Sequence, residues 1–234
     1  MLYENNHLYL LQKTAMLISF LLTILLSQIT ASQPLQNENY IVDNFNTNLA
    51  QTWKGRHNNF NKTYQIKTEN NNPFLSAKSI NSDNLIVKKI EVDLVKYPYL
   101  NWTWRANHLP ENGDESVKKY CDVAASVAVI LNTSRFFPKT IKYSWSTTLE
   151  KNSLTESPFA FWPAQCDVKI VQSGAVYKGE WQTERVNVLA DYKQFYSLST
   201  VESKVIYAIV IMTDSDNTQT LSAADYDAIY FSKN

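Results

Sequence analysis

Glycine is scarce in this chain, with only four among 234 residues: Gly55, Gly113, Gly174 and Gly179. No two of them stand at the spacing of a phosphate-binding loop, which excludes dinucleotide-binding and P-loop proteins. Asparagine, aspartate, serine and proline must therefore supply most of the turns.

The chain also lacks an excess of charge of either sign. Lysine plus arginine and aspartate plus glutamate each number 22, which gives a net charge of +0. Because no basic surplus is present to neutralise phosphates, we expect no nucleic-acid partner. Hydrophobic residues make up 44% of the chain and aromatic residues 13%, which is typical of a globular domain. A chain of this length buries a sizeable core without help from metals or disulfides.

Histidine and cysteine are too few and too widely spaced for common catalytic and metal-binding motifs. The three histidines are His7, His57 and His108, and no Gly-x-Ser-x-Gly motif accompanies them, which argues against a serine hydrolase. The two cysteines, Cys121 and Cys166, are not a close Cys-x-x-Cys pair, which argues against structural zinc. One disulfide between them and two free thiols remain as alternatives.

The N-terminal segment carries an apolar run of 13 residues at positions 14–26, preceded by Lys13 and followed by small and polar residues up to Ala31. This run is too short to span a bilayer comfortably. The layout predicts a signal peptide over residues 1–31, then a linker over residues 32–39. We therefore expect export to the periplasm or the extracellular space. An uncleaved signal acting as a membrane anchor is the alternative, and the one expected contact with a membrane.

Strand patterns recur at short spacing after the linker, without sustained helical periodicity. Two of the strands, residues 99–107 and 141–147, are aromatic and alternate with a period of two. One face of each collects the apolar side chains Leu100, Trp102, Trp104 and Ala106 in the first, and Ile141, Tyr143 and Trp145 in the second. Such alternation predicts strands with one apolar face. Many short strands separated by turns predict an all-β protein, in which residues 40–234 form a single antiparallel jelly-roll β-sandwich.

A set of short motifs follows in a fixed order along the mature chain. They are Asn101-Trp102-Thr103-Trp104-Arg105, Leu109-Pro110, Gly113-Asp114-Glu115, Asp122-Val123-Ala124-Ala125-Ser126, residues 141–147, Ser173-Gly174, Asn187, Asp191-Tyr192, residues 213–218 and Asp225-Tyr226-Asp227. Over residues 40–233 this set resembles a family of secreted bacterial proteins filed as domain of unknown function 3047. The resemblance implies a fold and export, but no reaction. Val127 departs from it, since a basic residue often stands there in the family.

A looser similarity concerns the first and last expected strands. Asp43-Asn44-Phe45 and residues 225–229 are similar to the terminal strands of galactose-binding-like jelly rolls in carbohydrate-binding modules. The similarity implies that these strands meet, so that Asp43 and Asp227 share a calcium ion, which prefers oxygen ligands. Residues 214–217 also resemble the start of an EF-hand loop, but the glycine at its sixth position and its final glutamate are missing.

The leading functional hypothesis is a non-catalytic carbohydrate-binding module at the cell envelope. Its ligand would be a glycan or polysaccharide, because aromatic faces beside a few oriented polar groups are typical of a small-molecule site. The predicted site consists of Arg105, Asp122, Lys142, Trp145 and Trp162. Core packing is the alternative for the strand aromatics.

Two further hypotheses belong to other functional classes. The first is a polysaccharide-acting hydrolase or lyase, with Asp122 and either Glu115 or Asp214 as the acid and the base. The second is a structural envelope protein that binds another protein through an exposed sheet edge or apolar patch.

Overall fold

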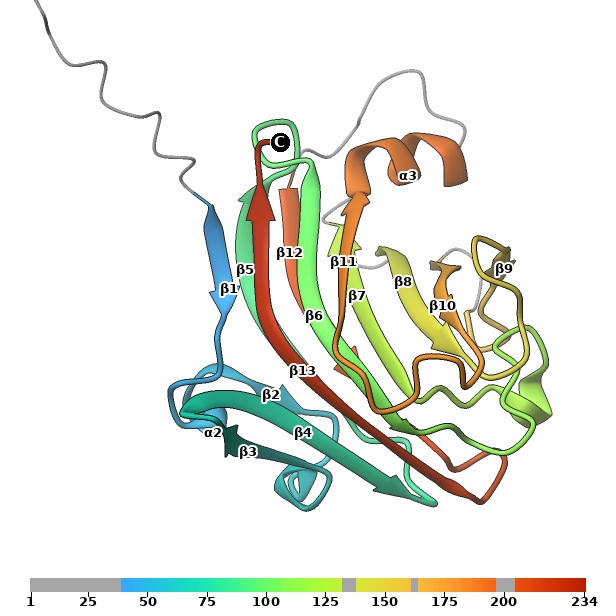
Figure 1. The fold of residues 1–234 in the computed structure, drawn as a ribbon. Helices are drawn as coiled ribbons and strands as arrows, with labels where there is room; N and C mark the ends of the chain where they lie inside the picture. The colour runs from blue at the N-terminus through green and yellow to red at the C-terminus, as the bar shows by residue number, and fades with distance from the viewer. Residues whose placement is uncertain (1–38, 132–137, 161–163, 197–204) are drawn as a thin grey trace, which may run out of the picture. The chain divides into compact units, whose positions relative to one another are not determined.

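Alternating apolar and polar residues build two β-sheets, as the computed structural model shows (Figure 1). The structure describes residues 39–131, 138–160, 164–196 and 205–234. The six-stranded sheet has the order β11-β6-β13-β4-β3, with β1 paired to β13. Its strands are β1 (Tyr40–Asp43), β3 (Tyr64–Glu69), β4 (Asn72–Ile80), β6 (Tyr99–His108), β11 (Gln182–Asn187) and β13 (Leu221–Ser232).

The seven-stranded sheet has the order β2-β5-β12-β7-β8-β10-β9. Its strands are β2 (Lys54–Gly55), β5 (Leu85–Asp93), β7 (Ala125–Leu131), β8 (Lys139–Ser146), β9 (Leu154–Glu156), β10 (Gln165–Ser173) and β12 (Val205–Met212). The predicted all-β sandwich is confirmed. One pair departs from the antiparallel prediction, because β10 runs parallel to β8.

The core lies between the inner faces of the two sheets, where aromatic rings meet. Trp102 packs on Tyr143 with ring centroids 5.8 Å apart, and Trp104 packs on Trp145, also at 5.8 Å. All four side chains are fully buried. Tilted and edge-on aromatic pairs of this kind add about 0.5–1.5 kcal/mol each beyond the area they bury. The placement of Trp145 in the predicted ligand site is therefore wrong, and the core-packing alternative holds.

A helix follows directly after β11, although the sequence showed no sustained helical periodicity after the linker. Strand β11 ends at Asn187, and α3 (Val188–Phe195) begins at the next residue. The side chain of Asn187 accepts a hydrogen bond of 2.9 Å from the backbone N–H of Ala190, which caps the helix. The helix is short, and its buried residues Val188, Asp191 and Tyr192 follow helical spacing. A second helix, α2 (Leu49–Thr52), and two short 3-10 turns, Phe60–Lys62 and Lys118–Tyr120, complete the described elements.

The predicted signal peptide and linker lie outside the described residues, apart from Asn39. None of the helices that the structure describes is long and apolar enough to cross a membrane.

Candidate functional site

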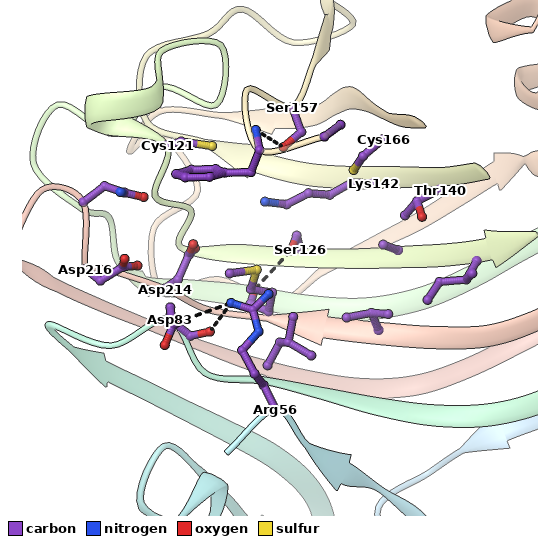
Figure 2. A pocket seen from close by; sticks show the side chains of 18 residues that line it. Arg56, Asp83, Cys121, Ser126, Thr140, Lys142, Ser157, Cys166, Asp214 and Asp216 are labelled. Carbon is purple, nitrogen blue, oxygen red and sulfur yellow. Dashed lines mark hydrogen bonds and ion pairs between the residues drawn. The ribbon is translucent and has the colours of Figure 1, made fainter. Parts of the chain in front are cut away.

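A groove of about 460 Å³ lies on the outer face of the seven-stranded sheet (Figure 2). Its floor comes from the residues that alternate with the core residues of three neighbouring strands: Ser126, Ala128 and Ile130 of β7, Thr140 and Lys142 of β8, and Val210 and Met212 of β12. The floor is mostly apolar, whereas charged side chains gather at the end of the groove where β12 leads into the following loop.

Lys142 extends into this groove from β8, with its ammonium directed toward Asp214 (Figure 2). None of the ion pairs or hydrogen bonds found among the described residues involves the Lys142 side chain. Burial lowers the pKa of Lys142, whereas the nearby Asp214 carboxylate raises it. The pKa of Lys142 lies above its ordinary value as a result. Within the part of the chain that the structure describes, Lys142 is therefore a charged donor without a direct partner.

Asp214 follows the end of β12 and faces Lys142. Its Oδ1 atom accepts a hydrogen bond of 2.9 Å from the backbone N–H of Val123, so the carboxyl is fixed in position. Burial raises the pKa of Asp214 to about 7, although the positive charge of Lys142 lowers it in part. The Asp122 and Asp216 carboxylates raise it further. The Asp214 carboxyl can thus either give or take a proton near neutral pH.

Asp122, Asp214 and Asp216 form a carboxylate cluster, in which one oxygen of each lies within 4.8 Å of the others. Asp122 accepts hydrogen bonds from the backbone N–H of Asn217 at 3.1 Å and from the N–H and hydroxyl of Thr218 at 2.6 Å each. Asp122 therefore positions the loop that carries the other two acids. Oxygen ligands of this kind suit a hard cation, but Lys142 already brings positive charge to the cluster, and we assign no ion to it.

Glu115 is fully buried and is not among the residues that line the groove. Its Oε2 atom accepts a hydrogen bond of 2.5 Å from the Ser146 hydroxyl, while Oε1 has no partner among the described residues. Burial raises the pKa of Glu115. Because no part of Glu115 faces the groove, the structure gives no support to the predicted acid–base pair of Asp122 and Glu115.

Arg105 lies on the outer face of the other sheet, which corrects the predicted site. Its guanidinium stacks 4.6 Å from the Trp181 ring centroid and pairs with Asp225 at 2.7 Å and Glu69 at 3.0 Å. The inner faces of the two sheets pack together, so Arg105 and Lys142 project away from each other on opposite sides of the sandwich. One site cannot contain both. Trp162 lies outside the described residues.

The two acids predicted to share calcium have separate partners in the structure. Strands β1 and β13 do pair, with Asp43 opposite Ile229. The Oδ2 atom of Asp43 accepts hydrogen bonds from Lys88 at 2.7 Å and from the indole of Trp53 at 2.8 Å. The carboxylate of Asp227 accepts one from Asn72 at 2.7 Å. The calcium ion stays a prediction, with Lys88 already neutralising Asp43.

Cys121 and Cys166 are free thiols, so the disulfide is not formed and the alternative holds. Both line the groove, on either side of Lys142 (Figure 2). Burial raises the pKa of Cys121 to about 12 and also raises the pKa of Cys166. The thiols therefore stay protonated at neutral pH and are poor nucleophiles.

Other residues of the groove were not predicted as a site. Phe159 stands on the long loop between β9 and β10 with 43% of its side chain exposed. The sequence around it is rich in aromatic residues, and this was the available signal for it. The ion pair of Arg56 and Asp83, 2.9 Å long, joins residues far apart in the chain, and no local motif marks it.

Comparison with known proteins supports the family predicted from the motifs. A model of the family described as "Protein of unknown function (DUF3047)" matches residues 51–230. No curated protein is significantly similar in sequence.

Solved structures with a similar fold include the native family 12 xyloglucanase from Bacillus licheniformis, with TM-score 0.43, 9% identity, and coverage of 84% of this chain and 97% of that chain. The xyloglucanase domain of NopAA from Sinorhizobium fredii, in complex with cellobiose, has TM-score 0.42, 9% identity, and coverage of 72% and 86%. The K2 cleaved adhesin domain of Lys-gingipain has TM-score 0.37, 9% identity, and coverage of 78% and 89%. Similarities this distant carry no argument about what the present chain binds.

Proposed function

We infer the function of this chain from its groove, since the chain belongs to the DUF3047 family and that family is described as being of unknown function. We propose that the groove on the outer face of the seven-stranded sheet binds a glycan. The observation that carries the proposal is the placement of Lys142 and Asp214, which face each other in the groove without a direct ion pair.

A sugar hydroxyl fits the space between these two groups. Its oxygen accepts a hydrogen bond from the Lys142 ammonium, while its proton is donated to the Asp214 carboxylate. Hydrogen bonds to charged groups are worth about 1.5–3 kcal/mol each when they are fully formed. The Asp214 carboxyl is held in place by the Val123 N–H before the ligand arrives, which lowers the cost of ordering the site on binding.

An aromatic ring and an apolar floor complete the arrangement that a pyranose requires. The exposed ring of Phe159 offers a flat surface to the C–H face of a sugar, and the neighbouring floor residues Ala128, Ile130 and Val210 are apolar. The other cation of the groove, Arg56, is already paired with Asp83. Because no large surplus of either charge remains, a neutral glycan fits better than a strongly charged one.

Export is the second part of the proposal. We propose that residues 1–31 direct the protein to the periplasm or the cell exterior, where polysaccharides are accessible. The N-terminal sequence of the mature protein tests this part. A new N-terminus near Ser32 supports it, and a cytoplasmic protein that retains Met1 contradicts it.

The groove proposal is tested by binding of the purified protein to an array of plant, fungal and bacterial glycans, followed by calorimetric titration with each glycan that binds. Phe159→Ala is expected to weaken binding roughly tenfold, equivalent to about 1.4 kcal/mol. Tyr177→Ala is the matched control, since Tyr177 is 44% exposed, against 43% for Phe159, and lies outside the groove. Equal effects of the two substitutions, or a blank array with folded protein, contradict the proposal.

Hydrolysis is a second candidate, favoured by one observation. The Asp214 carboxyl has a pKa of about 7 and lies beside Asp216 in the same groove. A protonated and an ionised carboxyl at short separation are what a retaining glycosidase needs. Release of reducing ends from the bound glycan, abolished by Asp214→Asn while binding persists, supports this candidate. Binding without any release excludes it for that glycan.

A further inference from the structure

A second hollow adjoins the groove at the loop after β12. It has a volume of about 310 Å³ and is lined by residues of two loops, 111–120 and 217–220. Asn217 lines both the groove and this second hollow, so the two spaces lie next to each other.

The wall between the two spaces is rigidly held. Asp122 accepts three hydrogen bonds from Asn217 and Thr218, two of them only 2.6 Å long. The Thr218 hydroxyl also lies 2.8 Å from that of Thr220. A wall fixed in this way holds the two hollows at a constant position relative to each other. A ligand that spans both of them requires this.

Consecutive lysines also connect the two spaces. Lys118 lies over the ring of Phe159, 5.5 Å from its centroid, at the groove. Its neighbour Lys119 lies over the ring of Tyr120, 5.2 Å from its centroid, at the second hollow. Each hollow therefore contains an aromatic ring with a cation beside it. Because Lys118 and Lys119 are consecutive, one short segment contacts both rings.

The chemistry of the second hollow resembles that of a sugar subsite. Besides Tyr120, its lining consists mainly of uncharged amides and hydroxyls: Asn112, Asn217, Thr218, Gln219 and Thr220. Amides and hydroxyls donate and accept hydrogen bonds at once, as sugar hydroxyls do. Glu111 and Lys119, one acid and one base, leave the hollow without a dominant charge.

We propose that the second hollow is a further subsite of the glycan site, so that the ligand is an extended oligosaccharide running from Phe159 past Asn217 to Tyr120. This inference rests on the proposed function of the groove. In this arrangement Asp122 is a positioning residue, because its hydrogen bonds to Asn217 and Thr218 fix the wall between the subsites.

Chain length of the ligand provides the test. The purified protein is titrated with oligosaccharide series of β-1,4-linked glucose, mannose and xylose, from disaccharide to hexasaccharide. For the series that binds, affinity is expected to rise roughly tenfold from the shortest to the longest member. Tyr120→Ala is expected to abolish that rise, with a larger loss of affinity for the hexasaccharide than for the disaccharide, whereas Phe159→Ala weakens every member.

Lys119→Met guards against loss of fold in the Tyr120 variant, because Lys119 is exposed and methionine keeps most of its unbranched side chain without the charge. This variant is expected to reduce the gain with length by about threefold. Affinity that does not change with length, or a Tyr120→Ala effect equal for all members, overturns the second subsite but leaves the groove proposal standing. Failure of every series to bind, with a blank glycan array, overturns both.

Discussion

Asp122 and Thr218 are joined by two hydrogen bonds of 2.6 Å, one from the backbone N–H and one from the hydroxyl of Thr218. The two residues are far apart in the chain, and Asp122 is almost fully buried. This contact fastens the loop after β12 to the segment before β7. The loop carries Asp214 and Asp216, so the geometry of the groove depends on a carboxylate that does not itself need to touch a ligand.

Replacing Asp122 is therefore expected to affect stability and the site together. Asp122→Ala leaves two backbone N–H donors without an acceptor and removes one partner of the Thr218 hydroxyl. It is expected to lower the free energy of unfolding by about 2–4 kcal/mol. Urea denaturation measures this loss, and hydrogen exchange at Asn217 and Thr218 reports the loosened loop. Asp93→Ala, which removes an exposed carboxylate bonded to the backbone of Val95 and Lys96, is the control. Similar small losses for both variants contradict the role assigned to Asp122.

Trp145 is expected to contribute to folding and not to binding. Its ring packs on Trp104, and its indole N–H donates to the Gly174 carbonyl at 3.0 Å. Trp145→Ala is expected to cost about 3–5 kcal/mol of stability through cavity formation. Trp145→Phe retains part of the ring packing and is expected to cost less, with unchanged glycan affinity. A stable Trp145→Phe variant that fails to bind glycan contradicts the burial of this ring in the core.

The raised pKa of Asp214 predicts a pH dependence of stability with a definite sign. Since its pKa is about 7 in the folded protein and near 3.8 in the unfolded chain, folding favours the protonated form. The contribution is fully present below the unfolded-state pKa and is lost as the pH rises toward and through 7. Relative to Asp214→Asn, the native protein is expected to lose stability between about pH 4 and pH 7, and to change little at higher pH. Parallel pH profiles for the two proteins contradict the shift.

Arg105 is expected to matter for stability alone. Its guanidinium, which is 17% exposed, pairs with Asp225 and stacks on Trp181, so Arg105→Ala leaves a buried carboxylate unpaired. A loss of roughly 2 kcal/mol in the free energy of unfolding is expected. Arg105→Lys retains the charge but not the planar stack, and it is expected to recover only part of that loss. Thermal unfolding of the two variants checks the order.

The fold was largely accessible from the sequence because period-two alternation reports directly which face of a strand is buried. Residues 99–107 and 141–147 show this, since their apolar faces form the core as predicted. The parallel pairing of β10 with β8 was not accessible, because pairing partners are set by long-range packing. Helix α3 was also missed, because eight residues carry too little periodicity to outweigh the neighbouring strand pattern.

The site was only partly accessible for a related reason. Alternation places Arg105 and Lys142 on polar faces correctly, but it does not tell which sheet each face belongs to. Aromatic composition drew attention to Trp145, whereas the groove uses Phe159 from a loop. The facing pair of Lys142 and Asp214 arises from residues far apart in the chain, and no local pattern announces it.

The central claim is that Lys142, and not Arg105, faces the ligand. The most direct measurement is a calorimetric titration of Lys142→Met and Arg105→Ala with a glycan that binds the native protein, after thermal unfolding has shown both variants to be folded. The account predicts that Lys142→Met loses at least tenfold in affinity, about 1.4 kcal/mol, while Arg105→Ala binds as the native protein does. Loss of binding in Arg105→Ala with retention in Lys142→Met would move the site to the other sheet and contradict the account.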